Sequence, residues 1–238
     1  MSKLNGKALL VQLNIRQATM RKRDKKATQD IAMSNNAEVS SGNYNKALLP
    51  MAQPLDDIKK LTWNIRKMFY ENTLPWLTDG TMILPSKNYL SFMEMYRSAK
   101  SQWEVLVEDF IRDYPRLINN AKISLGKLYD PDDYPDTDEL RNKFSMDVTV
   151  MPVPADDFRV SIPDNELAQI RSEVTQQVET ATAVAMKEAW QRLYDRVKHI
   201  SEKLHDPKSI FRDTLIDNTK DICDLLKRLN INDDENLE

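Results

Sequence analysis

The chain has 238 residues, of which 41% are hydrophobic and 30% are charged, and its formal net charge is −3. This composition is typical of a soluble, helix-rich protein that is long enough to bury a sizeable core. The four glycines fall in no phosphate-cradling pattern, which excludes a dinucleotide fingerprint, a P-loop and a nucleophile elbow. The negative charge argues against wholesale coating of nucleic acid and leaves room for a local basic patch.

The N-terminal region begins with an alternation of apolar and polar residues that predicts a strand over residues 8–19. A basic run from Arg21 to Lys26 follows it. The polar, Asn- and Ser-rich stretch after that run has no apolar period, so we expect a mobile loop near residues 24–43.

Two elements are predicted next along the chain. The apolar spacing after Pro54 indicates an amphipathic helix that ends near Asn72. Residues 74–78 and 81–84 flank Asp79-Gly80, which favours a β-hairpin closed by a two-residue type I′ turn.

A second helix is predicted to open at Pro85-Ser86. Pro115 should break or kink it, with a further helix running to about Leu128. A short helix is expected over residues 137–143. Alternating residues predict strands over 146–151 and 158–162, which should pair as a hairpin with the first strand of the chain beside it.

The C-terminal third contains the clearest signal in the sequence. Between Pro163 and Pro207 there are 43 residues without glycine or proline, and their apolar positions make ten steps over 37 positions. A mean of about 3.7 residues per turn predicts one nearly straight helix rather than a strict coiled coil. A terminal helix should begin at Asp206-Pro207, fold back antiparallel on the long helix, and leave residues 230–238 frayed.

These elements predict an α+β fold that is predominantly α, with a helical bundle, a long C-terminal helical hairpin and a small antiparallel sheet. We expect a mixed body over residues 1–162 and a helical pair over residues 163–238.

Cysteine and histidine are rare. Cys223 cannot form an internal disulfide, and it is expected to be a small buried hydrophobe on the last helix. His199 and His205 cannot supply the usual zinc spacings, so no metal or other cofactor is expected. The sequence contains no run of 18 apolar residues and no signal peptide, so we expect a cytoplasmic protein without a membrane partner.

The acidic segment from Tyr129 to Glu139 raises the question of a calcium site. An EF-hand loop that starts at Asp130 would place Tyr134 at a ligand position and Pro135 where glycine is required. The pattern therefore favours a turn followed by an acidic helix start.

The basic run is the candidate contact with nucleic acid or with an acidic protein, because clustered cations release counterions from phosphate. It has no interleaved aromatic residue, so a solvated strand end and loop is the competing interpretation. The candidate residues are Arg16, Arg21, Lys22, Arg23, Lys25 and Lys26.

Three features of the predicted helices could indicate function, and each also has an ordinary structural interpretation. The aromatic residues of the middle helices are expected in the core; they are Trp63, Phe69, Tyr70, Tyr89, Phe92, Tyr96 and Trp103. Asp195 and His199 stand four residues apart, which predicts a surface pair rather than a catalytic dyad. The small residues between Thr180 and Ala185 predict either a seam for self-association or an ordinary helix core, and the seam residues are Ala181, Val184 and Ala185.

Several blocks of the sequence carry a family resemblance. They are Met1 to Val11, Tyr44 to Lys46, Asn72 to Trp76, Asp113 to Pro115, Met151 to Pro154 with Asp157 to Val160, and Trp190 to His199. Together they resemble uncharacterised proteins of tailed phages and integrated mobile elements, over nearly the whole chain. The resemblance implies an origin in a phage or mobile element, residence in the host cell cytoplasm, and genes that often lie near MoxR-type AAA+ ATPases and von Willebrand A proteins. It carries over no catalytic residue.

The leading hypothesis is a non-enzymatic interaction or adaptor protein whose long helix assembles with itself or with a larger complex, an AAA+ ATPase being one candidate. The first alternative is a nucleic-acid-binding accessory protein that uses the basic segment near residues 16–26. An enzyme with dispersed catalytic residues is the second alternative.

Overall fold

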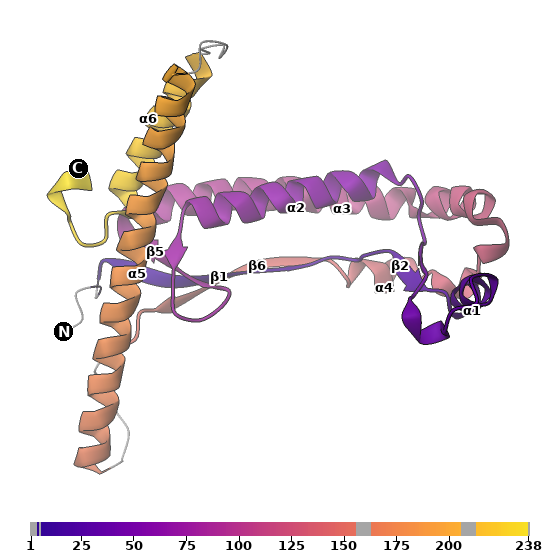
Figure 1. The fold of residues 1–238 in the computed structure, drawn as a ribbon, viewed down its shortest axis with the longest axis horizontal. Helices are drawn as coiled ribbons and strands as arrows, with labels where there is room; N and C mark the ends of the chain where they lie inside the picture. The colour runs from indigo at the N-terminus through magenta and orange to yellow at the C-terminus, as the bar shows by residue number, and fades with distance from the viewer. Residues whose placement is uncertain (1–3, 5, 156–162, 206–212, 238) are drawn as a thin grey trace. The chain divides into compact units, whose positions relative to one another are not determined.

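The computed structural model describes Leu4 and residues 6–155, 163–205 and 213–237 (Figure 1). The fold is α+β and predominantly α, as predicted. It divides into two compact units. Unit 1 comprises Met1–Leu13, Ile65–Arg97 and Val148–Glu238, and unit 2 comprises Asn14–Asn64 and Ser98–Asp147. This division differs from the expected one at residue 162, because the C-terminal helices belong to the same unit as the N-terminal strand.

A four-stranded sheet has the order β4-β5-β1-β6, with bounds Leu74–Pro75, Thr81–Pro85, Ala8–Arg16 and Ser145–Pro152. In unit 1, β1 pairs antiparallel with β5, from Ala8 opposite Pro85 to Gln12 opposite Thr81. The predicted first strand and its place beside the strand at residue 146 are confirmed. The predicted strand over residues 158–162 lies outside the described residues.

The predicted hairpin exists, but its turn is different. β4 pairs with β5 through Leu74 opposite Ile83 and Pro75 opposite Met82, so residues 76–80 connect the strands. Gly80 has a φ of 79°, whereas Asp79 is not among the residues with positive φ. A type I′ turn needs positive φ at both central residues, so that part of the prediction is wrong. The N–H of Thr81 donates to the Thr78 carbonyl at 3.2 Å and closes the turn.

Two long helices pass through both units. The first, α2 (Gln53–Glu71), confirms the predicted helix. The short η2 (Ser86–Asn88) precedes α3 (Tyr89–Leu125), which continues through Pro115. Of the two outcomes predicted for Pro115, a break or a kink, the break is therefore wrong. The buried stripe continues on both sides of the proline, through Ile111, Tyr114 and Leu117, so packing holds the helix in one piece where one backbone hydrogen bond is missing.

In unit 2, the segment expected to be a loop contains α1 (Lys25–Ser34) and η1 (Val39–Ser41), so the prediction of an unstructured stretch is wrong. Asp24 caps α1 by accepting the N–H of Ala27 at 2.9 Å, and Thr28 and Ala32 are buried. The weak periodicity of these two small residues hid the helix. The remaining elements of this unit are β2 (Arg21–Arg23), β3 (Asn45–Ala47), η3 (Gly126–Leu128), η4 (Pro131–Asp133) and the predicted short helix α4 (Thr137–Arg141).

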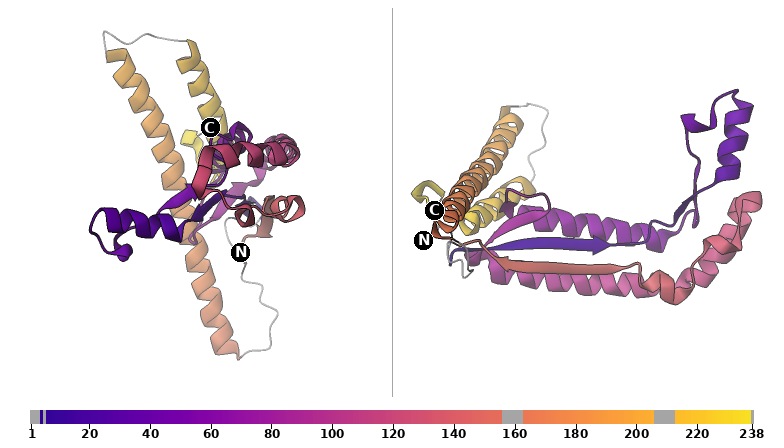
Figure 2. Two further views of the ribbon diagram at one scale, coloured as in Figure 1. Left: turned by 90° about the vertical axis from the view of Figure 1, so that its right-hand side faces the viewer. Right: turned by 90° about the horizontal axis from the view of Figure 1, so that it is seen from below.

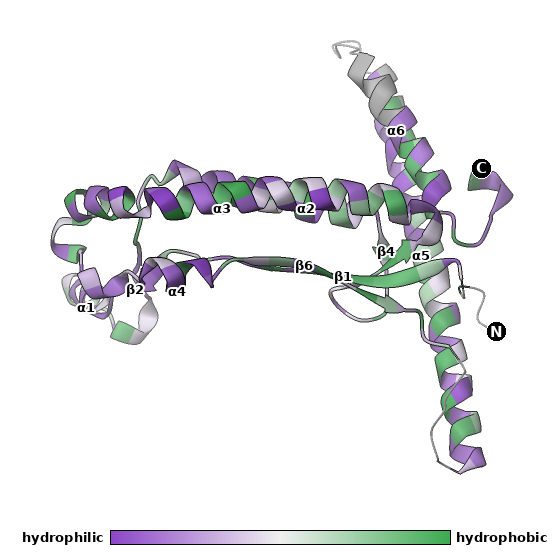
Figure 3. Cartoon of the chain, turned by 180° about the vertical axis from the view of Figure 1, so that it is seen from behind, coloured by the Kyte–Doolittle hydropathy of each residue, from purple (hydrophilic) through white to green (hydrophobic). Residues whose placement is uncertain are grey.

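The long predicted helix is confirmed in unit 1: α5 (Asp164–His205) runs for 42 residues without a break. The terminal helix, α6 (Asp213–Leu229), runs back antiparallel beside the C-terminal part of α5 (Figures 1 and 2). The predicted start of that helix at Asp206 lies outside the described residues. β1 is predominantly hydrophobic, whereas hydrophobic and hydrophilic residues alternate along α5 and α6 (Figure 3).

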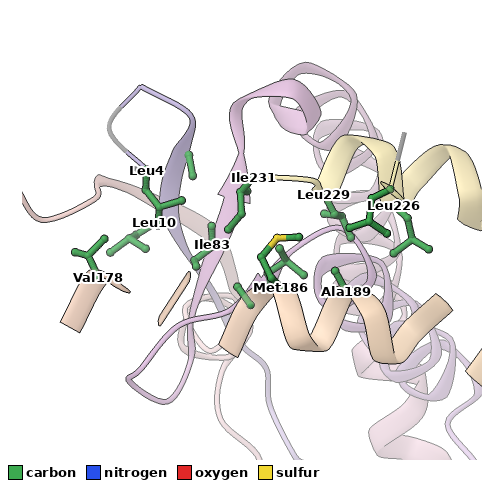
Figure 4. Close-up of a cluster of buried hydrophobic side chains, with 13 residues drawn as sticks. Leu4, Leu10, Ile83, Val178, Met186, Ala189, Leu226, Leu229 and Ile231 are labelled. Atoms are coloured by element: carbon green, nitrogen blue, oxygen red, sulfur yellow. The ribbon is translucent and has the colours of Figure 1, made fainter. Parts of the chain in front are cut away.

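The core of unit 1 collects side chains from distant parts of the chain. Ala189 and Met186 of α5 pack with Leu226 and Leu229 of α6 in one buried cluster (Figure 4). The same cluster includes the sheet residues Leu10, Leu74 and Ile83 and the terminal residues Leu4, Ile231 and Leu237.

The C-terminal tail was expected to fray, and this prediction is wrong for residues 230–237. Ile231 and Leu237 are buried, and η5 (Glu235–Leu237) ends the described chain. The Asp233 carboxylate accepts hydrogen bonds from Lys7 at 2.7 Å and from Lys87 at 2.9 Å. These contacts lower the pKa of Asp233 to about 2. Two buried apolar residues and two ion pairs therefore hold the tail.

Two burial predictions need correction. Cys223 is exposed rather than buried on α6. Among the aromatic residues, Phe69, Phe92, Tyr96 and Trp103 are buried as expected, but Trp63 is 62% exposed and Tyr70 is 49% exposed. The buried stripe of α2 runs through Ile58, Thr62, Ile65 and Phe69, so Trp63 and Tyr70 lie one position beyond it.

Candidate functional site

The six predicted basic residues lie in unit 2, on three consecutive elements. Arg16 ends β1, β2 contains Arg21, Lys22 and Arg23, and Lys25 and Lys26 open α1. All six are exposed at the residue level. Lys22 differs from the other five because its ammonium group is paired.

The partner of Lys22 belongs to a cluster of charges that the sequence did not reveal. Asp133, 8% exposed, contacts Lys22 at 2.5 Å through Oδ1 and Lys46 at 2.6 Å through Oδ2. Lys46, 6% exposed, also lies 3.3 Å from Asp24 and donates to the Leu128 carbonyl at 2.6 Å. The acidic turn therefore holds the β2–β3 ribbon through one buried carboxylate.

The ionisation of this cluster follows from its geometry. Burial opposes the charged form of Asp133, but the contacts with Lys22 and Lys46 outweigh burial and lower the pKa of this carboxyl. Burial also opposes the charge on Lys46, and the contacts with Asp133 and Asp24 outweigh it and raise the pKa of this ammonium. Both groups are therefore charged at neutral pH.

The rest of the acidic segment behaves as predicted, as a turn and a helix start. Asp130 accepts the N–H of Asp132 at 3.1 Å, and Asp136 caps α4 by accepting the N–H of Glu139 at 2.7 Å. Burial raises the pKa of Tyr134 to about 12. Its hydroxyl donates to the Leu48 carbonyl at 2.7 Å, which ties the turn to the segment after β3. In the ranges that the structure describes, no group of His, Cys, Asp and Glu residues could hold a metal ion.

The small-residue seam of α5 lies at the centre of unit 1. Ala181 and Ala185 are fully buried in the core of unit 1, whereas Val184 is 45% exposed and lies outside it. The two alanines lie four residues apart on the side of the helix that faces the sheet and α6.

Replacing Ala185 by leucine is expected to lower the free energy of unfolding by about 1–3 kcal/mol, because the added carbons have no space in a packed core. Ala168→Leu, the same change at an exposed position near the start of the same helix, should change it by less than about 0.5 kcal/mol. Urea denaturation monitored by circular dichroism measures both. Equal effects of the two changes would contradict the assignment of Ala185 to the core.

The opposite side of α5 carries a feature that the sequence analysis missed. Trp190 is 37% exposed, Tyr194 61% and Val197 57%, and their spacing of four and three residues places them on one face. The same face continues with small exposed residues, Ala183 before them and Ser201 after them. We call these five residues the outer face of α5. The signal was present in the sequence as a second stripe, but the longer core stripe dominated the pattern.

Trp190 is held in a defined position on the outer face. Its indole N–H interacts with the Asp234 carboxylate in the C-terminal tail, and this interaction makes a small contribution to lowering the pKa of that carboxyl. The same carboxylate accepts the backbone and side-chain N–H groups of Asn236, and these contacts are the main reason that its pKa is lowered. The tail that closes the core thus also fixes the orientation of an exposed aromatic ring.

A groove of about 1010 Å³ lies between α5, α6 and the end of α2. Leu225, Leu226 and Leu229 provide apolar walls, and charges of both signs line it. Arg192 donates to the Glu71 carbonyl at 3.1 Å and to Glu188 at 3.0 Å. Of the predicted pair, Asp195 accepts a hydrogen bond from Gln191 at 2.8 Å, and within the described residues no ion pair joins it to His199.

Comparison with protein-family models, with curated proteins and with solved structures found no match to this chain. Within the helices that the structure describes, none combines the length and the apolar character that crossing a membrane requires.

Proposed function

We propose that this chain is a non-enzymatic interaction protein that assembles with a second copy of itself through the outer face of α5. The observation that carries the proposal is the exposure of Trp190, Tyr194 and Val197 in one stripe, opposite the buried alanines of the same helix. Exposed aromatic residues on a rigid element are typical of the central residues of protein interfaces.

The outer face has the chemistry of an interface rather than of a solvated surface. Its five residues carry no charge and extend over 18 positions, about 27 Å at about 1.5 Å per residue. Lys187 lies at its edge, where a long aliphatic stem can cover apolar surface.

The stripe is complementary to itself in an antiparallel arrangement. A two-fold axis at the level of Arg192 would place Trp190 opposite Tyr194 of the second copy and Ala183 opposite Ser201. Val197 would then face the aliphatic stem of Lys187, and both copies would use the same patch, as an isologous interface requires.

A binding role also suits the other features of the chain. The charged groups with clearly shifted pKa values are held in ion pairs or in helix and turn caps, such as Asp133 with Lys46 and Asp233 with Lys7. These contacts stabilise the fold. They hold the Asp133, Lys46, Asp233 and Lys7 groups in their charged forms, so none of these four groups is suited to proton transfer.

Sedimentation velocity of the purified chain tests the proposal. The wild type is expected to dimerise reversibly, and Tyr194→Glu should raise the dissociation constant at least about tenfold, because a charge buried in an apolar interface costs more than about 1.4 kcal/mol. The matched control is Gln177→Glu, which adds the same charge at an exposed position of the same helix. A monomeric wild type, or equal weakening by both changes, would refute the assignment.

The resemblance to phage and mobile-element proteins supports a wider adaptor role, in which the dimer contributes to a larger complex. A MoxR-type AAA+ ATPase is the partner to test first, with purified ATPase and with the Tyr194→Glu variant as the control. Binding that is lost together with dimerisation would support this part of the proposal, and absence of binding would remove the ATPase from it.

A further inference from the structure

On one face of the β2–β3 ribbon in unit 2 the cations are paired with a carboxylate, and on the other face they are not. Across the ribbon, Arg21 pairs with Ala47, Lys22 with Lys46, and Arg23 with Asn45. Successive residues of a strand point to opposite faces. Lys22 and Lys46 therefore share one face, where both contact Asp133, while Arg21 and Arg23 share the other.

The second ribbon face is part of a larger group of unpaired cations. We define the basic face as Arg16, Arg21, Arg23, Lys25 and Lys26. All five are exposed, and none forms an ion pair with any carboxylate in the described parts of the chain. Elsewhere in the same unit, cations such as Lys59, Arg116 and Arg141 are paired with nearby carboxylates.

No carboxylate in the described residues compensates the charge of these five side chains. Asp24 lies between the two halves of the basic run, but its carboxylate caps the N–H of Ala27 and contacts Lys46. The acidic turn meets the ribbon on the opposite face, through Asp133. Five positive charges within eleven residues of sequence thus face solvent while the chain as a whole is negative.

We infer that the basic face binds the phosphate backbone of double-stranded nucleic acid. Clustered cations gain free energy from counterion release at a duplex, where the charge density is highest. Asn45 is exposed on the same ribbon face as Arg23, so its amide adds a neutral hydrogen-bond donor for phosphate oxygens beside the cations.

A duplex suits this surface better than a single strand. Binding of single strands relies on aromatic side chains that stack on bases. Neither the basic face nor its neighbours Asn45 and Ala47 on the ribbon offers such a ring. The proposed interaction is thus electrostatic and depends little on the base sequence of the duplex. It does not require dimerisation of the chain through the outer face of α5.

The salt dependence of binding tests this inference. Fluorescence anisotropy would measure the dissociation constant of the full chain for labelled DNA and RNA duplexes of about 20 base pairs, and for the matching single strands. With five phosphate contacts, the slope of log K against log salt should approach about −4.5 for DNA. The affinity should then fall about 500-fold between about 50 and about 200 mM salt.

Paired variants locate the surface. Arg21→Ala with Arg23→Ala should reduce the magnitude of the slope by about 2, since each phosphate contact contributes about 1. Lys25→Ala with Lys26→Ala should also reduce the magnitude of the slope by about 2. This double change does not destabilise α1 through the helix dipole, because it removes positive charges from the helix N-terminus. The control, Lys60→Ala with Lys122→Ala, removes the same charge from two exposed lysines of unit 2 and should leave the slope unchanged.

Four results would overturn the inference: no duplex binding at about 50 mM salt, a single strand bound more tightly than either duplex, an equal loss of slope in the control, or tighter binding of polyglutamate than of duplex. The last result would assign the surface to an acidic protein instead. Binding of the DNA and RNA duplexes with similar slopes, each reduced in magnitude by about 2 in both test variants, would support it.

Discussion

Asp133→Asn is expected to lower the free energy of unfolding by about 3–5 kcal/mol, as is typical when one partner of a buried ion pair is removed. Asp133 is 8% exposed and Lys46 is 6% exposed. Without the carboxylate, the ammonium group of Lys46 stays buried with Asp24 at 3.3 Å as its remaining charged partner. Urea denaturation followed by tryptophan fluorescence and circular dichroism measures the change.

Two further variants test whether the destabilisation comes from breaking the buried Asp133–Lys46 ion pair rather than from removing any carboxylate of this turn. Asp132→Asn changes an exposed neighbour in the same turn and should shift the free energy of unfolding by less than about 0.5 kcal/mol. Lys46→Met combined with Asp133→Asn removes both charges, and it should be more stable than Asp133→Asn alone. If Asp133→Asn behaved like Asp132→Asn, the buried cluster would not stabilise unit 2.

The same cluster predicts the effect of acid. The pKa of Asp133 is lower in the folded chain than its ordinary value, so the folded state favours the ionised carboxylate. Its stabilisation is fully present above the ordinary pKa of about 3.9 and is lost as the pH falls through the lower folded value. Unfolding free energy should therefore decline below about pH 4, and this decline should be shallower in Asp133→Asn.

The second large effect is expected for Leu229→Ala, which should cost about 2–5 kcal/mol of unfolding free energy. Leu229 is fully buried at the end of α6, in the cluster that also contains Ala189 and Ile231 (Figure 4). Truncation leaves a cavity where α6 and the tail pack against α5.

Leu90→Ala is the matched control, because it makes the same change on a helix at a residue that is 80% exposed. Its effect should be below about 0.5 kcal/mol. Chemical denaturation of both variants gives the comparison. Similar stabilities would mean that α6 does not pack on α5 in solution.

The elements with strong and uninterrupted patterns could be predicted from the sequence. The absence of glycine and proline between Pro163 and Pro207 was sufficient for α5, and the alternation near Leu9 to Ile15 was sufficient for β1. Both patterns report local preferences that tertiary packing reinforced.

Other elements depend on contacts between distant residues and could not be predicted. Burial of Thr28 and Ala32 stabilises α1, and packing on both sides of Pro115 keeps α3 whole. The tail looked frayed because its charges dominate its composition, whereas Lys7, Lys87 and the core bind it.

The candidate sites were predicted only in part. The basic residues were identified, but only the β2–β3 register separates Lys22, which is neutralised, from Arg21 and Arg23. The buried partner, Asp133, lies 111 residues from Lys22 in a segment that matched an ordinary acidic turn. The outer face of α5 became visible once the core side of that helix was known.

Disulfide trapping across the outer face of α5 tests the central claim most directly. In a Cys223→Ser background, chains with Ala183→Cys would be mixed with chains with Ser201→Cys under mild oxidation. Antiparallel pairing brings these positions within the Cα separation of about 7 Å that a disulfide tolerates. We predict covalent dimers in the mixture at a higher yield than with either variant alone, and their loss after Tyr194→Glu. A mixture that stays monomeric, or crosslinks no better than its separate components, would contradict the account.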